Sequence, residues 1–283
     1  GEVCFMISLV SIELYKIFKK WRSYIGFLAI SVLVPIIQIA LLIEGEKYLE
    51  FLTQNLQQTF VFVGNLLNGY LIAFIVLGSF WVHIPFLVTL VTGDLLAGEA
   101  TSGTYRMLIT RPVSRLKLVT AKFIAGLIYT HSLVLWLSIV SLVLGIILFG
   151  TGELIVIGEK IVIFSKDDII WRFLLAYGYA ALSMSVVASL AFLLSSLVEN
   201  AIGPIISTMA IIIVFTVLSA LNFDFFIELR PYLFTNYMPL WRSFFDDPID
   251  YSEVLKSGFI LLGHVISFFG LTIYLFNKKD ILS

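Results

Sequence analysis

Residues 123–149 read FIAGLIYTHSLVLWLSIVSLVLGIILF, with no Asp, Glu, Lys or Arg between Phe123 and Phe149. A transmembrane helix needs about 20 such residues. Within a membrane every backbone polar group must be bonded internally, so a run this long indicates an α-helix rather than an isolated strand. The stretch therefore predicts an integral membrane protein.

Five further stretches, before and after this one in the chain, are also long and apolar enough to form transmembrane helices. Pro35 and Gln38 lie in the first of them, and an embedded helix tolerates both when neighbouring helices satisfy the freed groups. Six spans place both termini on one side of the membrane. With 123–149 as the third span, the others are expected at about 23–43, 69–91, 171–198, 201–221 and 257–276.

The composition agrees with a lipid-embedded chain. Of 283 residues, 60% are hydrophobic and 13% are charged, whereas soluble domains carry about 25% charged residues. This balance excludes a soluble globular enzyme. A net charge of −1 gives no reason to expect nucleic acid as a partner, and the single Cys4 with three histidines supports neither a disulfide nor a metal site.

Basic residues set the expected orientation, because Lys and Arg are retained on the cytoplasmic side. Most of the 18 basic residues fall before the first span, between the second and third spans, or after the sixth. We expect cytoplasmic N- and C-termini in a bacterial-type plasma (inner) membrane. The first span is too long for a signal peptide, so we expect it to be retained.

Residues 5–22 show helical spacing. Phe5, Leu9, Ile12 and Tyr15 recur on one face, with Glu13, Lys16 and Lys20 on another. The pattern predicts an amphipathic helix on the inner leaflet. Continuation of the first span into the cytoplasm is the alternative.

Three other segments carry weaker patterns. Residues 53–68 are uncharged but rich in Gln and Asn, which suits an interfacial helix or a polar approach to the second span. Residues 150–166 alternate like a hairpin around Gly158. Residues 222–256 place aromatics beside charges, as in an interfacial belt. Small residues predict that the fourth and fifth spans form the interior, whereas residues 133–148 face lipid or a partner.

The loop between the second and third spans is the most distinctive segment. Residues 94–115 read DLLAGEATSGTYRMLITRPVSR. Asp94 and Glu99 suit an early helical turn, a break is expected near Ser102-Gly103, and Arg111-Pro112 suits a second helix start. A loop that only sets topology, with Arg111 and Arg115 meeting lipid phosphates, is the alternative.

This segment resembles the permease subunits of type-2 ABC transporters. Such permeases tend to have acidic residues shortly after the second span, then Ser-Gly-Thr, a short apolar stretch, Pro-hydrophobic-Ser-Arg and a Lys at the third span. Here these elements read Asp94, Glu99, Ser102-Gly103-Thr104, Met107-Leu108-Ile109, Pro112-Val113-Ser114-Arg115 and Lys122. The six spans, the amphipathic N-terminal helix and the long last external loop extend the similarity over nearly the whole chain.

The resemblance implies a single transmembrane permease domain over residues 1–283 with a cytoplasmic coupling helix that docks into a separate ATPase. It further implies two ATPase copies that bind ATP and Mg, a second or related permease copy, and substrate export. No G-x-x-x-x-G-K-[ST] phosphate loop occurs in this chain, so by itself it is not expected to be an enzyme. Glu99 and Arg106 would contact the ATPase, with Arg111 and Arg115 nearer the membrane. The full coupling set is Asp94, Glu99, Thr101, Ser102, Gly103, Thr104, Arg106, Arg111, Pro112 and Arg115.

Three histidines, His83, His131 and His264, fall in or near apolar spans. Ionisable residues in a membrane are candidates for a transport pathway, although a neutral imidazole also serves as a hydrogen-bonding group between helices. A stand-alone polytopic carrier and a membrane-embedded lipid-modifying enzyme are therefore alternative functions. Asp246, Asp247, Asp250 and Glu253 form a solvated face rather than a recognisable catalytic or metal pattern.

Overall fold

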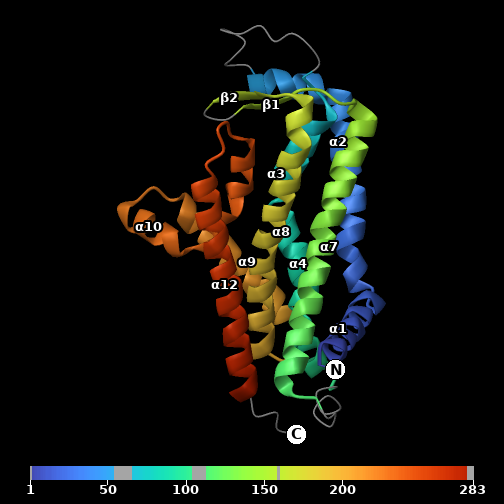
Figure 1. Ribbon diagram of the computed structural model, residues 1–283, viewed down its shortest axis with the longest axis vertical. Helices are drawn as coiled ribbons and strands as arrows, with labels where there is room; N and C mark the ends of the chain where they lie inside the picture. The colour runs from blue at the N-terminus through green and yellow to red at the C-terminus, as the bar shows by residue number, and fades with distance from the viewer. Residues whose placement is uncertain (1, 54–65, 104–112, 158–159, 279–283) are drawn as a thin grey trace.

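A computed structural model describes residues 2–53, 66–103, 113–157 and 160–278, and it is an elongated bundle of α-helices (Figure 1). Within these residues, five helices are long and apolar enough to cross a membrane, and a bent helix pair raises the number to six. The all-α membrane fold expected from the sequence is confirmed. The five are α2 (Arg22–Thr53), α7 (Arg115–Phe149), α8 (Lys166–Leu197), α9 (Ile202–Ala220) and α12 (Tyr251–Lys278).

Several helices extend beyond the uncharged stretches that predicted them. The helix α2 continues past residue 43 to Thr53, and α7 begins at Arg115 instead of 123. Charged side chains end an apolar run without ending a helix, because a helix continues where they are hydrated, as at Glu44 to Lys47, or paired with opposite charges, as at Lys122. Ser114 caps α7, and its hydroxyl accepts a bond from the Lys117 amide at 3.3 Å. The second helix start predicted at Arg111-Pro112 lies outside the described residues.

The second predicted span, 69–91, is not one straight helix. It consists of α3 (Gly69–Phe80) and α4 (His83–Thr92), which are bent by 57° at their junction. Pro85 explains the break, because it lacks the amide hydrogen that would bond the Trp81 carbonyl and its ring crowds that carbonyl. The sequence therefore contained the signal for this correction.

The most buried long helix is α8, as its small residues predicted. Its apolar window is 78% buried inside the bundle, whereas that of α9 is 17% buried. The prediction that the fifth span also lies in the interior is wrong for this chain. On α9, Thr208 packs inward, while the larger Ile206, Ile213 and Val217 point away from the protein.

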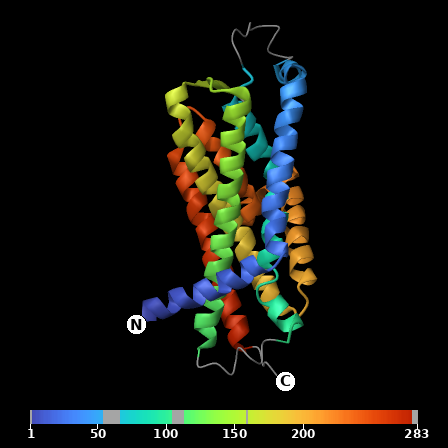
Figure 2. The same ribbon diagram turned by 90° about the vertical axis from the view of Figure 1, so that its right-hand side faces the viewer.

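The helix α1 (Glu2–Lys19) is separate from α2 and lies across the long helices rather than along them (Figure 2). The described part of α1 therefore does not continue the first span. Phe5, Ile12 and Tyr15 remain exposed on the surface of the chain, as an interfacial helix requires. In contrast, Glu13 is buried against the bundle, so the charged face contacts protein.

The opposite end of the bundle, here called the hairpin end, carries β1 (Leu154–Ile157) and β2 (Ile161–Phe164). These strands pair antiparallel, Leu154 opposite Phe164, which confirms the predicted hairpin. Its expected turn at Gly158 and most of the 53–68 segment lie outside the described residues. Between α9 and α12 the chain forms α10 (Asp224–Leu229), η1 (Arg230–Tyr232), α11 (Phe234–Tyr237) and η2 (Met238–Phe245).

The η2 segment packs into the bundle at the hairpin end. Trp241 and Phe245 are each 1% exposed, and both rings contact Phe74 of α3. Arg172 of α8 holds this segment in place, because its guanidinium bonds the Phe244 carbonyl at 2.8 Å. The predicted aromatic belt is thus in part an internal packing layer.

Candidate functional site

A group of charged side chains joins α1, α2, α7 and the short helix α5 (Ala97–Thr101) at the end of the bundle opposite the hairpin. We call it the ionic cluster. Its residues come from two segments of the chain. One is the predicted amphipathic helix with the start of α2, and the other is the loop after the second span with the start of α7. Its members are Glu13, Lys16, Lys20, Arg22, Asp94, Glu99 and Lys122.

Lys122 is the centre of the cluster. Its side chain is 2% exposed, and its ammonium lies 2.6 Å from Glu13 Oε2 and 2.8 Å from Glu99 Oε1. Burying an ammonium is costly unless carboxylates pair with it, and here two of them do. One cation therefore ties α7 to both α1 and α5.

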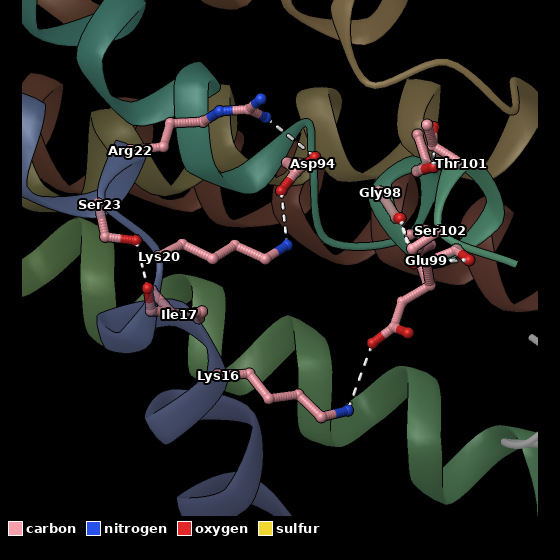
Figure 3. Close-up of polar contacts among 12 residues, drawn as sticks. Lys16, Ile17, Lys20, Arg22, Ser23, Asp94, Gly98, Glu99, Thr101 and Ser102 are labelled. Carbon is pink, nitrogen blue, oxygen red and sulfur yellow. Dashed lines mark hydrogen bonds and ion pairs between the residues drawn. The ribbon is translucent and has the colours of Figure 1, made fainter. Parts of the chain in front are cut away.

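Asp94 forms the second half of the cluster (Figure 3). Its carboxylate lies 2.8 Å from Lys20 Nζ and 2.9 Å from Arg22 Nη1, one oxygen for each cation. Gly98 leaves the space that this carboxylate occupies, since a Cβ at that position would collide with the Asp94 oxygens. A glycine one turn after Asp94 is therefore required for the pairing.

Lys16 bridges the two halves, with Nζ 2.8 Å from Glu13 Oε1 and 3.3 Å from Glu99 Oε1. Partial burial disfavours its charged form, but the bonds and charges of Glu13 and Glu99 outweigh this and raise the pKa of the Lys16 ammonium. Lys16 therefore stays protonated throughout the physiological range. All seven members of the cluster line a cavity of about 290 Å³.

The helix α5 is also bonded to the core helix. The Ser195 hydroxyl of α8 accepts bonds from the backbone amides of Leu96 and Ala97, at 3.2 and 2.9 Å. These amides lie at the start of α5, where no intrahelical partner exists. At the other end, the Thr101 hydroxyl donates to the Glu199 carbonyl at 2.6 Å. The short helix is thus anchored at both ends.

The tip of α5 is the exposed part of the segment. Thr101, Ser102 and Gly103 are all exposed, and the expected break near Ser102-Gly103 is confirmed. Gly103 has φ of 67°, a left-handed conformation that glycine adopts without a steric penalty and that commonly ends helices. Four predicted coupling residues, Thr104, Arg106, Arg111 and Pro112, lie outside the described residues.

Two predicted coupling residues point inward rather than outward. Asp94 and Glu99 place their carboxylates in the ionic cluster, with side chains 10% and 15% exposed. Arg115, the last of the predicted set, is the first residue of α7. The structure thus separates an anchoring pair, Asp94 and Glu99, from the exposed tip.

Five members of the cluster, all except Asp94 and Glu99, were not among the site residues predicted from the sequence. Glu13, Lys16 and Lys20 share one helical face, at spacings of three and four residues. In an amphipathic helix we expect the charged face to contact water. Such a face equally suits a protein surface of opposite charge. Arg22 was interpreted as an orientation signal, and Lys122 both as an orientation signal and as part of the family motif.

The three histidines are not part of the cluster. They lie on α4, α7 and α12, and each Nδ1 lies near a carbonyl of the same chain four residues earlier. His264 also packs edge-on against Phe234 and Phe268. These contacts are those of hydrogen-bonded imidazoles, and the proposed pathway role for His83, His131 and His264 stays a prediction.

Comparison with known proteins gives the family. An uncharacterized protein of Bacillus subtilis (strain 168), YhcI, is 32% identical over 120 residues, which is 39% of this chain and 37% of YhcI. The chain thus matches little more than a third of that relative's length. The family described as "Protein of unknown function (DUF2705)" matches residues 31–282. Because this match covers most of the chain, the protein belongs to the DUF2705 family.

Proposed function

We propose that this chain is the membrane permease subunit of an ATP-driven ABC transporter that exports its substrate. In this proposal a separate ATPase, present in two copies, binds ATP and Mg. A second copy of this chain or a related permease completes the pathway. The termini lie in the cytoplasm, on the inner side of a bacterial-type plasma membrane.

The proposal rests on one observation, which is that α5 is firmly held by the bundle while its tip is exposed. A helix of one turn stands at the end of the bundle where the basic residues gather, with an exposed tip at Thr101 to Gly103. Ion pairs and hydrogen bonds hold it to α1, α7 and α8. A loop that served only to orient the chain would need basic residues, but not this set of anchors.

The same contacts describe how movement would pass from an ATPase to the spans. Force on the tip acts on Ser195 of α8, the most buried long helix, through the first amides of α5. It acts on α1 and α7 through Glu99, which Lys16 and Lys122 both contact. The tip is also joined, through residues 93–96, to the bent span α3–α4. In this proposal, movement of the tip changes the angle between the two segments of that span, as in a hinge.

Co-purification from the native host tests the proposal. The tagged chain, extracted in mild detergent, is expected to recover a subunit that bears a phosphate-binding loop, together with ATP hydrolysis in the eluate. Ser102→Arg, at the exposed tip of α5, should reduce the recovery, whereas Tyr251→Arg at the hairpin end should not. Recovery of the chain alone, without ATPase activity, would favour a stand-alone carrier or a membrane enzyme.

A further inference from the structure

A second cavity, of about 320 Å³, lies at the hairpin end of the bundle, whereas the ionic cluster lies at the opposite end. A volume of this size is at the lower end of the range for small-molecule sites. We call it the α3 pocket, because residues of α3 line its length from Leu71 to Ser79. Residues of α2, the hairpin and η2 complete it, including Tyr48, Leu49, Ile155, Val156, Trp241 and Arg242.

The walls of the α3 pocket are mainly apolar and rigid. Phe74 and Trp241 face it, and their rings contact each other edge to face at 5.5 Å between centroids. Trp241 is 1% exposed, so its orientation is fixed by packing. Leu71 and Ile155 contribute aliphatic surface. These walls suit an aliphatic chain.

One cation lines this apolar pocket. The Arg242 guanidinium stands beside Gly78, since a Cβ on Gly78 would lie 3.7 Å from Arg242 Nη2. Gly78 is the tenth residue of the bent span that runs from Gly69 to Thr92. The Arg242 side chain is exposed, so the cation lies at the rim of the pocket rather than in its buried wall.

The Arg242 guanidinium has N–H donors available for a ligand. Across the described ranges, Arg242 has neither an ion pair nor a hydrogen bond, and its guanidinium lies 5.5 Å from the centroid of the Trp241 ring. Arg172, in the same half of the bundle, by contrast bonds Asp168 and two carbonyls. A planar donor of this kind matches a carboxylate or a phosphate with two parallel bonds.

The pocket lies beside the break between α3 and α4, which Pro85 causes. Interrupted helices occur at membrane depth where the chain borders a cavity or packs against protein. Gly78 contributes no side chain, and this keeps open the space in front of the guanidinium. The break, the glycine and the cation therefore meet at one end of an apolar pocket.

We propose that the α3 pocket binds a single-chain amphipathic anion. Its carboxylate or phosphate pairs with Arg242, and its aliphatic chain lies along Leu71, Phe74 and Trp241. The modest volume favours one chain over the two chains of a phospholipid. Binding here requires no ATPase, so the proposal is independent of the proposed transporter function.

Equilibrium binding of radiolabelled dodecanoate to the purified chain, in a neutral steroid-based detergent, tests this. Dodecanol is the matched probe without the charge. The unsubstituted chain should bind dodecanoate saturably and at least tenfold more tightly than dodecanol, as expected for a charge-assisted bond. Arg242→Gln should remove that preference, whereas Lys256→Gln, which removes an exposed cation outside the pocket, should retain it.

Two further measurements keep the test decisive if Arg242→Gln folds poorly. Gly78→Leu keeps the cation but fills the pocket, and it should weaken dodecanoate binding at least tenfold. Dilauroyl phosphatidylglycerol, which has two chains and an anionic head, should compete poorly. Equal binding of dodecanoate and dodecanol, or unchanged binding in both variants, would overturn the site. Competition by the phospholipid equal to that of dodecanoate would overturn the single-chain assignment.

Discussion

The Lys122 ammonium lies 2.8 Å from the Glu99 carboxylate, and this contact joins the start of the third span to the exposed short helix α5. The same ammonium contacts Glu13 of α1 at 2.6 Å. Three segments that are distant in sequence thus share one buried cation. The position and orientation of α5 depend on this arrangement.

Removing the cation should be costly. In Lys122→Met, the carboxylates of Glu13 and Glu99 lose their buried partner, and we expect the free energy of unfolding to fall by about 3 kcal/mol. Denaturant unfolding in detergent micelles measures this. Glu13→Gln and Glu99→Gln, added to Lys122→Met, should restore part of the loss. Lys256→Met is the control at an exposed position, and a loss equal to that of Lys122→Met would refute the argument.

Gly98→Ala separates coupling from stability. The added Cβ displaces the Asp94 carboxylate from Lys20 and Arg22. The Lys20 and Arg22 side chains are 53% and 40% exposed, so water can replace the carboxylate at each cation, and we expect a loss of about 1 kcal/mol in stability. ATP hydrolysis by the co-purified complex should nevertheless decline, because α5 loses an anchor. Gly178→Ala is the matched control, since a Cβ there meets nothing within 4 Å, and equal ATPase rates in the two variants would argue against anchoring by Asp94.

Ser195→Ala removes the acceptor for the first amides of α5. The cost should be about 1 kcal/mol, comparable to the loss of a helix cap. Hydrogen exchange at Leu96 and Ala97 should accelerate, while exchange in the rest of α8 stays unchanged. Ser189→Ala is the control, because that buried hydroxyl bonds only within α8, to Val186. Unchanged protection of Leu96 and Ala97 would show that Ser195 does not anchor α5.

Arg172→Gln tests the packing of the η2 segment. The guanidinium bonds the Phe244 and Asp246 carbonyls and the Asp168 carboxylate, and the variant removes these three bonds. We expect stability to fall by about 2 kcal/mol and residues 238–250 to become sensitive to protease. Arg230→Gln, on the adjacent η1, should leave residues 238–250 protected. Equal cleavage in both variants would contradict a specific role for Arg172.

Hydrophobicity alone predicted much of the fold. The absence of charge over 123–149 located the core of α7, and small residues identified α8 as the interior helix. The same reasoning failed for α9, because the small residues at its start, Gly203 and Pro204, say little about whether the isoleucines that follow pack inward or outward. It also missed the bend after Phe80, although Pro85 offered a physical reason to expect one.

The candidate site was predictable only in part. Asp94 and Glu99 were singled out, but their partners on α1 were not, because residues about 80 positions apart leave no local signal of contact. The spacing of Glu13, Lys16 and Lys20 did define a charged face. Deciding whether that face meets water or protein required the three-dimensional arrangement of α1 across α7.

The most direct test of the account is photo-crosslinking from the tip of α5 in intact cells of the native host. Benzoylphenylalanine at Ser102, an exposed position, should yield a covalent product with a subunit that bears a phosphate-binding loop. The same probe at Tyr251, an exposed residue at the hairpin end, should not yield that product. Absence of such a product from Ser102, or its equal formation from Tyr251, would contradict the proposal that α5 couples this chain to an ATPase.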